Sequence, residues 1–152
     1  MNKKGVTLIE LIVVMVIIGI GAALMAPGIG RWLSNYRLRS ATRDIVSTMR
    51  TAQMRAISTN LTYQVFFTGT TYVLRYKTTA GTWVNEVTTT TQSLPSGISI
   101  SANTFPVFSG GKSAQFNTDS TASGGDLTLN GQLGTKTLTV SPITGRCTIK
   151  DN

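Results

Sequence analysis

Histidine is absent from the chain, and cysteine occurs only once among the 152 residues, as Cys147. Without histidine, neither a Ser/His/Asp triad nor a Cys/His nucleophile pair can be built. A single cysteine excludes an intramolecular disulfide, and the missing histidine also excludes the mixed Cys/His zinc sites. We therefore expect no enzyme and no cofactor, and we interpret Cys147 as an ordinary strand residue.

Charged residues are few, at 13% of the chain, and the acidic ones are fewest, with six against fourteen basic residues. The net charge of +8 favours anionic partners such as nucleic acid, anionic lipid or acidic protein, without choosing among them. The acidic, glycine-rich stretch 117–126 departs from the EF-hand pattern, so we expect a plain loop there and no metal site. Outside Glu10, none of the acids has a neighbour suited to acid–base catalysis: Asp44, Glu86, Asp119, Asp126 and Asp151.

A long apolar run lies near the N-terminus. Residues 11–30 are twenty consecutive uncharged positions, which as a helix would reach roughly 30 Å, the thickness of the hydrocarbon core of a bilayer. Lys3 and Lys4 precede the run and Arg31 follows it. The short positive leader favours a cytoplasmic N-terminus with the bulk of the chain outside. We predict a single transmembrane helix.

Two ordinary interpretations of this run remain open. One is a cleaved secretory signal peptide, with residues 21–23 as a small-residue cleavage site. The other is a simple signal anchor. Neither explains Glu10, since a charged group in an apolar span costs on the order of 2.5–3.5 kcal/mol at mid-bilayer and less near the edge.

The stretch KKGVTLIEL, residues 3–11, resembles the signal of type IV pilins and pseudopilins. The resemblance implies that a prepilin peptidase cuts after Gly5 and methylates the new N-terminus at Val6, where the family usually has phenylalanine. It also implies that Glu10 meets the N-terminal amine of a neighbouring subunit. Pairing would let each charge offset the burial of the other and would set the depth at which subunits dock.

Pro27 lies inside the same predicted helix. Proline lacks an N–H and crowds the carbonyl of Ala23, so we expect a bend or a loosened turn. Members of the pilin family often carry a proline here and melt locally in the filament. A tolerated kink of a membrane helix would produce the same pattern.

After Arg31 the apolar residues recur at three- and four-residue steps, the spacing of one helical face: Leu38, Ala41, Ile45, Met49, Ala52 and Ala56. We therefore predict one helix from about residue 6 to about residue 58. The arginines of this half, at positions 37, 39, 43, 50 and 55, are interpreted as a solvated or subunit-facing surface.

From residue 62 onward the sequence alternates like β-strands separated by turn residues. TYQVFF and TYVLRYK flank a hairpin at Gly69, and the further predicted strands are TWVNEVTTTT, GISIS, SAQFNT, DLTL, KTLTVS and GRCTIK. The threonine-rich stretch 87–93 fits a strand edge, a loop or a glycan-bearing segment. The predicted fold class is α+β, with the long helix packed on small antiparallel sheets. The predicted parts are a leader (1–5), an apolar helix (6–30), an amphipathic helix (31–60) and a β domain (61–152).

Two C-terminal stretches, FNTDSTASGGDLTL and TKTLTVSPITGRCTI, are similar to minor pseudopilins of the GspH/FimT class. Ser120 stands where this class often has glycine. Some relatives bind DNA through a Gly-Arg-x-Arg pattern, of which Gly145 and Arg146 are present while Thr148 replaces the second arginine. A DNA site would use Arg146 and Lys150, with added charge from Arg75, Lys77, Lys112 and Lys136.

The resemblance predicts a minor pilin or pseudopilin at or near the tip of a type IV pilus or a type II secretion filament. Its partners would be the prepilin peptidase, other pilins and the lipid of the bacterial inner membrane, with the globular domain in the periplasm. The alternatives are a DNA-binding minor pilin for DNA uptake and an unrelated secreted β domain.

Overall fold

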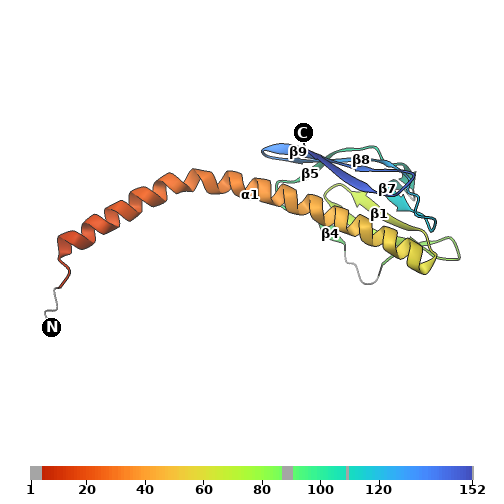
Figure 1. Cartoon of the computed structure of the whole chain (residues 1–152), viewed down its shortest axis with the longest axis horizontal. Helices are drawn as coiled ribbons and strands as arrows, with labels where there is room; N and C mark the ends of the chain where they lie inside the picture. Colours follow the sequence, from red (N-terminus) through yellow and green to blue (C-terminus); the bar gives the residue numbers. More distant parts are fainter. Residues whose placement is uncertain (1–4, 87–90, 109, 152) are drawn as a thin grey trace. The chain divides into compact units, whose positions relative to one another are not determined.

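The computed structural model describes residues 5–86, 91–108 and 110–151 (Figure 1), and within the helix it leaves out the side chains of residues 25–29. The chain divides into two compact units, Met1–Leu33 and Ser34–Asn152.

One helix, α1, covers Leu8–Thr59, which confirms the helix predicted for residues 6–58. It ends at Thr59 and is followed by Asn60, whose φ of 55° is the left-handed conformation that commonly closes a helix. The helix assignment continues through position 27, but the loosening predicted at Pro27 falls on side chains outside the described residues. Among the residues that the structure describes, no helix has a stretch both long and apolar enough to cross a membrane.

The first β-sheet contains the strands β1 (Tyr63–Thr68), β2 (Thr71–Lys77), β3 (Trp83–Asn85), β4 (Gln92–Ser93), β6 (Val107–Phe108) and β7 (Gly111–Phe116). Their order is β3-β2-β1-β7-β6, with β4 also paired to β2, and every pairing is antiparallel. The predicted hairpin between β1 and β2 is confirmed, and Gly69 at its turn has a φ of 54°.

The second sheet has the order β10-β9-β8-β5 and is also antiparallel. Its strands are β5 (Ser99–Asn103), β8 (Gly125–Gly131), β9 (Gly134–Val140) and β10 (Cys147–Asp151). The sequence pattern predicts all four within a few residues.

Two details of the β prediction are wrong. The long strand expected over residues 82–91 is only the short β3, with residues 87–90 outside the described part of the chain, and β6 was not predicted.

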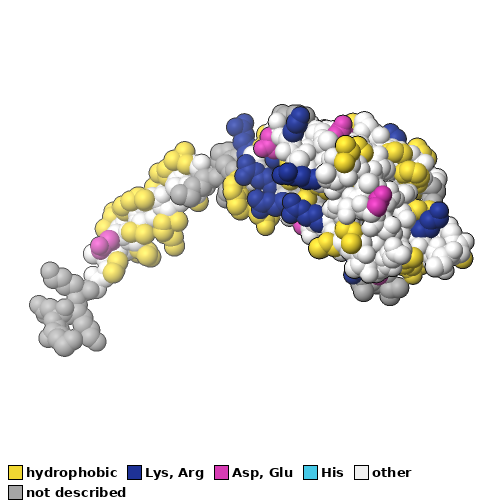
Figure 2. All heavy atoms as spheres, turned by 45° about the vertical axis from the view of Figure 1, so that its right-hand side comes forward, with side chains coloured by type: hydrophobic (Ala, Val, Ile, Leu, Met, Phe, Trp, Pro, Cys, Tyr) yellow, Lys and Arg dark blue, Asp and Glu magenta, His cyan; other side chains and the backbone are white. Residues whose placement is uncertain are grey.

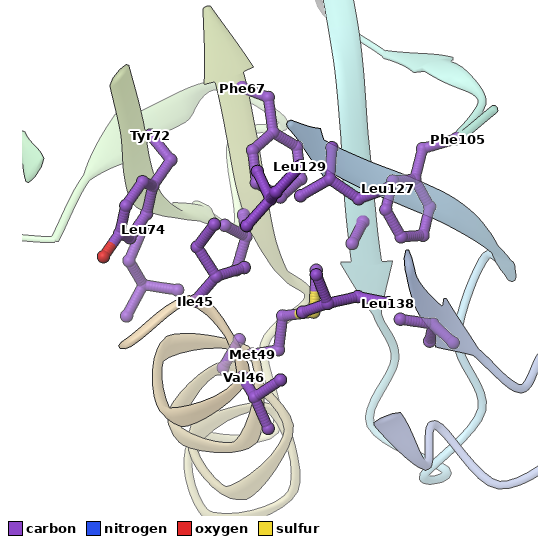
Figure 3. Close-up of a cluster of buried hydrophobic side chains, with 14 of the residues drawn as sticks. Ile45, Val46, Met49, Phe67, Tyr72, Leu74, Phe105, Leu127, Leu129 and Leu138 are labelled. Carbon is purple, nitrogen blue, oxygen red and sulfur yellow. The ribbon is translucent and has the colours of Figure 1, made fainter. Parts of the chain in front are cut away.

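The core lies between the second half of α1 and the two sheets (Figure 3). The predicted apolar face of the helix is confirmed, because each of its six residues is at most 4% exposed. Phe67 and Leu74 reach this core from the first sheet, and Leu127 and Leu138 reach it from the second. All the buried apolar residues of the described chain lie at position 38 or later, so residues 34–152 contain a complete core of their own.

Gly125, the first residue of β8, lies directly against Phe105, which is only 2% exposed. A Cβ added to Gly125 would lie 2.6 Å from the Cδ1 of Phe105 and 3.0 Å from its Cα. The φ of Gly125 is 141°, a conformation that residues with a side chain rarely adopt. Both the space and the backbone therefore require glycine at this position.

Candidate assembly and interaction sites

The start of α1 is capped by Thr7. The backbone N–H of Glu10 donates a hydrogen bond to the Thr7 Oγ1 (3.3 Å), and the N–H of Leu11 donates to the Thr7 carbonyl (3.2 Å). Thr7 and Glu10 thus occupy the two key positions of a capping-box sequence, T-x-x-E. Thr7 is not among the site residues predicted from the sequence, although the T-x-x-E motif is visible there. The Glu10 carboxylate also stabilises the start of the helix itself, because a negative charge there complements the helix dipole.

The first unit presents apolar side chains around the helix, because the consecutive residues from Leu11 to Ile18 are all exposed. Figure 2 shows this apolar surface on the face that it draws. From Val6 to Leu24, the exposed fractions of the large apolar side chains run from 48% to 76%. A helix that is apolar all round is ordinarily covered by lipid or by protein, not by water. The residues are Val6, Leu8, Ile9, Leu11, Ile12, Val13, Val14, Met15, Val16, Ile17, Ile18, Ile20 and Leu24.

Two loops that are distant in the sequence meet at Gln53 on α1. The Gln53 Nε2 donates hydrogen bonds to the Thr144 carbonyl (2.8 Å) and to the Ser120 carbonyl (3.5 Å). The same two loops are joined directly, because the N–H of Ala122 donates to the Pro142 carbonyl (2.9 Å). The two C-terminal stretches that resemble the GspH/FimT class therefore form one structural corner.

The backbone of this corner explains its glycine pattern. Gly145 has a φ of 61°, and a Cβ there would lie 2.6 Å from the Gln53 Nε2. Ser120 has a φ of 71°, a conformation that favours glycine and costs other residues roughly 1–2 kcal/mol. The local hydrogen bonds compensate, since Asp119 accepts from both the N–H (3.0 Å) and the hydroxyl (2.6 Å) of Thr121. These bonds hold the pKa of the Asp119 carboxyl below its ordinary value.

The residues predicted for a DNA site fall into two groups. Arg146, which directly precedes β10, and Lys150 within it are both exposed, and each lies two residues from Thr148, so period-two alternation places them on one side of the sheet. Two of the residues predicted to add charge have contacts elsewhere. The Arg75 guanidinium lies 4.1 Å from the centre of the Phe66 ring in the first sheet. The ammonium group of Lys112 donates to the Asn103 carbonyl.

A groove of about 430 Å³ runs between α1 and the second sheet. Its lining residues are Arg39, Thr42, Arg43, Lys136, Ile149 and Asp151. Figure 2 shows that Lys and Arg side chains gather beside the helix on this face. The Lys136 ammonium forms an ion pair with Asp151. The hydrogen bond from Lys136, then its charge and that of Arg39, lower the pKa of the Asp151 carboxyl.

Most of the globular unit matches the model of a known protein family. Residues 41–145 match the family described as type II transport protein GspH, and residues 1–26 match the prokaryotic N-terminal methylation motif. The chain belongs to the GspH family. It is accordingly a minor pilin or pseudopilin, a structural subunit of the filaments that such proteins build. No match was found in the comparison with functionally curated proteins.

Solved structures show the same fold as this GspH-family chain. The minor pseudopilin EpsH from the type 2 secretion system of Vibrio cholerae matches with a TM-score of 0.62 at 10% identity, over 76% of this chain and 97% of EpsH. The type IV minor pilin FimU of Pseudomonas aeruginosa matches with a TM-score of 0.60 at 12% identity, over 78% of this chain and 92% of FimU. The predicted pilin-like α+β fold is confirmed. These matches give no support to the DNA-uptake alternative, because their names refer to secretion and pili.

Cys147, the only cysteine of this GspH-family chain, opens β10 with its sulfur 3.6 Å from the Met49 Sδ. Its interpretation as a strand residue is confirmed. Burial raises the pKa of the Cys147 thiol to about 11, and the charge of Arg50 opposes the shift. The folded state therefore favours the protonated thiol, and this contribution to stability is lost as the pH rises from about 9 to about 11.

We expect the alkylation of Cys147 by iodoacetamide to be at least about tenfold slower at pH 8 in the folded chain than in urea, because the thiolate fraction is small. The folded-state rate should rise steeply only above about pH 10. Rates measured from pH 7 to 11 by mass spectrometry test this expectation. A folded-state midpoint near pH 8.5 would contradict the burial of this thiol.

Proposed function

We propose that this GspH-family chain is made as a precursor with a five-residue leader, residues 1–5, which a prepilin peptidase removes after Gly5. The same enzyme methylates the new N-terminus at Val6. The match of residues 1–26 to the N-terminal methylation motif carries this proposal. Residues 5–7, which are exposed and lie outside any helix or strand, support it because a protease needs an accessible, non-helical segment.

Residues 6–30 then hold the subunit in the bacterial inner membrane and later lie in the filament core, with the β domain in the periplasm. The uncharged run of residues 11–30 supports a membrane location. The exposed apolar side chains from Val6 to Leu24 support both settings, since lipid and packed helices cover such a surface equally well. Residues 31–60 complete the helix, and residues 61–152 form the displayed domain.

Glu10 places the subunit in register within the filament. Its carboxylate pairs with the N-terminal ammonium group of the neighbouring subunit, which removes two isolated charges from an apolar setting. Pro27 loosens the helix so that its apolar half can pack among other helices. The position of the subunit is at or near the tip of a type II secretion filament or a type IV pilus.

The mass of the N-terminal peptide from the protein in its native membranes tests this proposal. We expect a mature chain that starts at N-methylated Val6, and we expect the precursor to accumulate in a host that lacks the prepilin peptidase. A chain that starts at Leu24, or that keeps Met1, would instead indicate a conventional signal peptide or a simple anchor.

A further inference from the structure

We propose that the groove between α1 and β10 binds an acidic, extended segment of another protein chain, which adds to β10 as a further strand. The groove lies wholly within residues 34–152 and combines an open strand edge, an apolar contact and a row of arginines. Each of these three features supports a separate part of the recognition.

The outer edge of β10 is open. Among the described strands, β10 pairs with β9 alone and ends the sheet. The N–H of Ser141 donates to the Arg146 carbonyl (3.0 Å), which makes 141 and 146 a hydrogen-bonded pair. In an antiparallel ladder such pairs alternate, so the backbone N–H and C=O of Ile149 point away from β9, as do those of Asp151. An incoming strand could pair with these groups.

The side chains beside that edge suit a strand that carries acidic and apolar residues on the same face. Ile149 lines the groove and remains 44% exposed, so it offers an apolar contact that the fold itself does not cover. The Cys147 sulfur lies at Met49 while Asp151 shares the groove with Arg39, so β10 runs antiparallel to the helix beside it. A strand placed along β10 would therefore also run along α1.

The charges select an acidic occupant. Arg39 and Arg43 are exposed and line the groove from the helix side. The groove's own acid, Asp151, is already paired with Lys136. The nearest other acid of α1, Asp44, accepts a hydrogen bond from the Ser40 hydroxyl (3.4 Å). It is also close enough to β2 to contribute, after burial, to the raised pKa of Tyr72. Although Arg39 also acts on Asp151, whose pKa its charge lowers, the groove holds three cations, Arg39, Arg43 and Lys136, against this one acid, so its net charge is positive.

The spacing of the arginines fits a strand. Four helical residues rise about 6 Å, and two strand residues rise about 6.8 Å, so Arg39 and Arg43 can each meet a carboxylate from alternate positions of the added strand. Bidentate pairing of guanidinium with carboxylate would fix the register. A nucleic acid could use the same charges, but it would not use the backbone of β10.

A defined peptide tests the proposal on residues 34–152, which contain the complete core. The probe is a fluorescein-labelled peptide, Thr-Glu-Thr-Glu-Thr-Val-Thr, whose two glutamates and valine lie on one face of a strand, and its binding is followed by anisotropy at about 50 mM salt. One control peptide replaces both glutamates with glutamine. The other replaces the third and fifth residues with proline, which keeps the charge but cannot extend a sheet. We expect the probe to bind at least about tenfold more tightly than either control.

Matched variants locate the site. Arg39→Gln and Arg43→Gln should each lower the affinity for the probe about fivefold. Arg146→Gln makes the same charge change outside the groove and should keep the affinity within about twofold of that of the unchanged chain. The backbone amides of Ile149 and Asp151 should gain protection from hydrogen exchange when the probe is bound. The proposal is overturned by an absence of binding, by equal binding of the proline peptide, or by equal loss on Arg146→Gln. It is also overturned if duplex DNA displaces the probe and itself depends on Arg39.

Discussion

A chain that carries Glu10→Gln is expected to be cut and methylated normally and yet to be scarce in filaments. Glutamine preserves the size of the side chain and remains acceptable in a capping box, but it removes the negative charge. The ammonium group of the neighbouring subunit would then be buried without a partner, at a cost of about 3–5 kcal/mol. This corresponds to a loss of about 10²–10³-fold in incorporation. Immunoblots of sheared filaments, together with the mass of the N-terminal peptide, measure both results.

Thr7→Ala is the matched control for Glu10→Gln. It removes the cap observed at the start of α1, in which the Glu10 N–H donates to the Thr7 hydroxyl, while the acid itself remains. Loss of such a cap costs about 0.5–2 kcal/mol of helix stability, and packing in the filament should compensate for it. We therefore expect near-normal assembly of Thr7→Ala. If Glu10→Gln assembles normally and Thr7→Ala fails, Glu10 serves only to cap the helix.

Moving the acid by one turn tests whether its depth matters. In Glu10→Leu combined with Val14→Glu, the carboxylate stays on the same helical face but lies about 6 Å deeper. A register role predicts that this double variant fails to restore assembly. Restored assembly would mean that any acid in the apolar helix suffices.

Gly125→Ala is expected to lower the free energy of unfolding of residues 34–152 by about 2–6 kcal/mol. This is as much as replacing a large buried side chain in the core by alanine. The new methyl group would lie 2.6 Å from the Phe105 ring and 3.0 Å from the Phe105 Cα, and the backbone atom cannot rotate away. Overpacking of this kind costs about 1–3 kcal/mol. The φ of 141° adds strain of about 1–3 kcal/mol for a residue with a side chain. Urea denaturation followed by circular dichroism measures the difference.

Gly134→Ala provides the control in the same sheet. Gly134 opens β9, and a Cβ there would have no heavy atom within 4 Å. We expect its free energy of unfolding to change by less than about 1 kcal/mol, and an increase would fit the lower entropy of the unfolded alanine chain. Equal losses in both variants would show that Gly125 is not under the steric constraint described.

The helix could be predicted from the sequence because its evidence is local. The apolar repeat from Leu38 to Ala56 indicates which face of the helix is buried, and the same face is buried in the structure. The strands could be located for the same reason, since alternation and turn residues lie within each segment. The hairpin at Gly69 needs only a short turn. The short β6 has two residues, too few to produce a pattern.

The site residues predicted from the sequence stand within one segment. Gly5, Val6 and Glu10 lie in a single stretch inside residues 1–26, which match the N-terminal methylation motif, and the roles of the three residues stay predictions. The corner at Gln53 and the groove at Arg39 depend on neighbours about 70 to 110 positions away in the chain. The basic residues grouped for DNA illustrate the limit, because Arg75 lies in the first sheet and Arg146 precedes a strand of the second. Charge alone could not reveal which of them are neighbours.

The contact between Met49 and Cys147 joins the first and the last elements of the globular unit, 98 residues apart in the chain. The helix can form as soon as it is synthesised, but its apolar face lacks the Met49–Cys147 contact until Cys147 has left the ribosome. Contacts between residues so far apart in the chain form late, which slows folding and leaves apolar surface exposed until they form. We therefore expect a chaperone to bind the growing chain. A chain truncated before residue 147 should aggregate instead of forming a smaller domain.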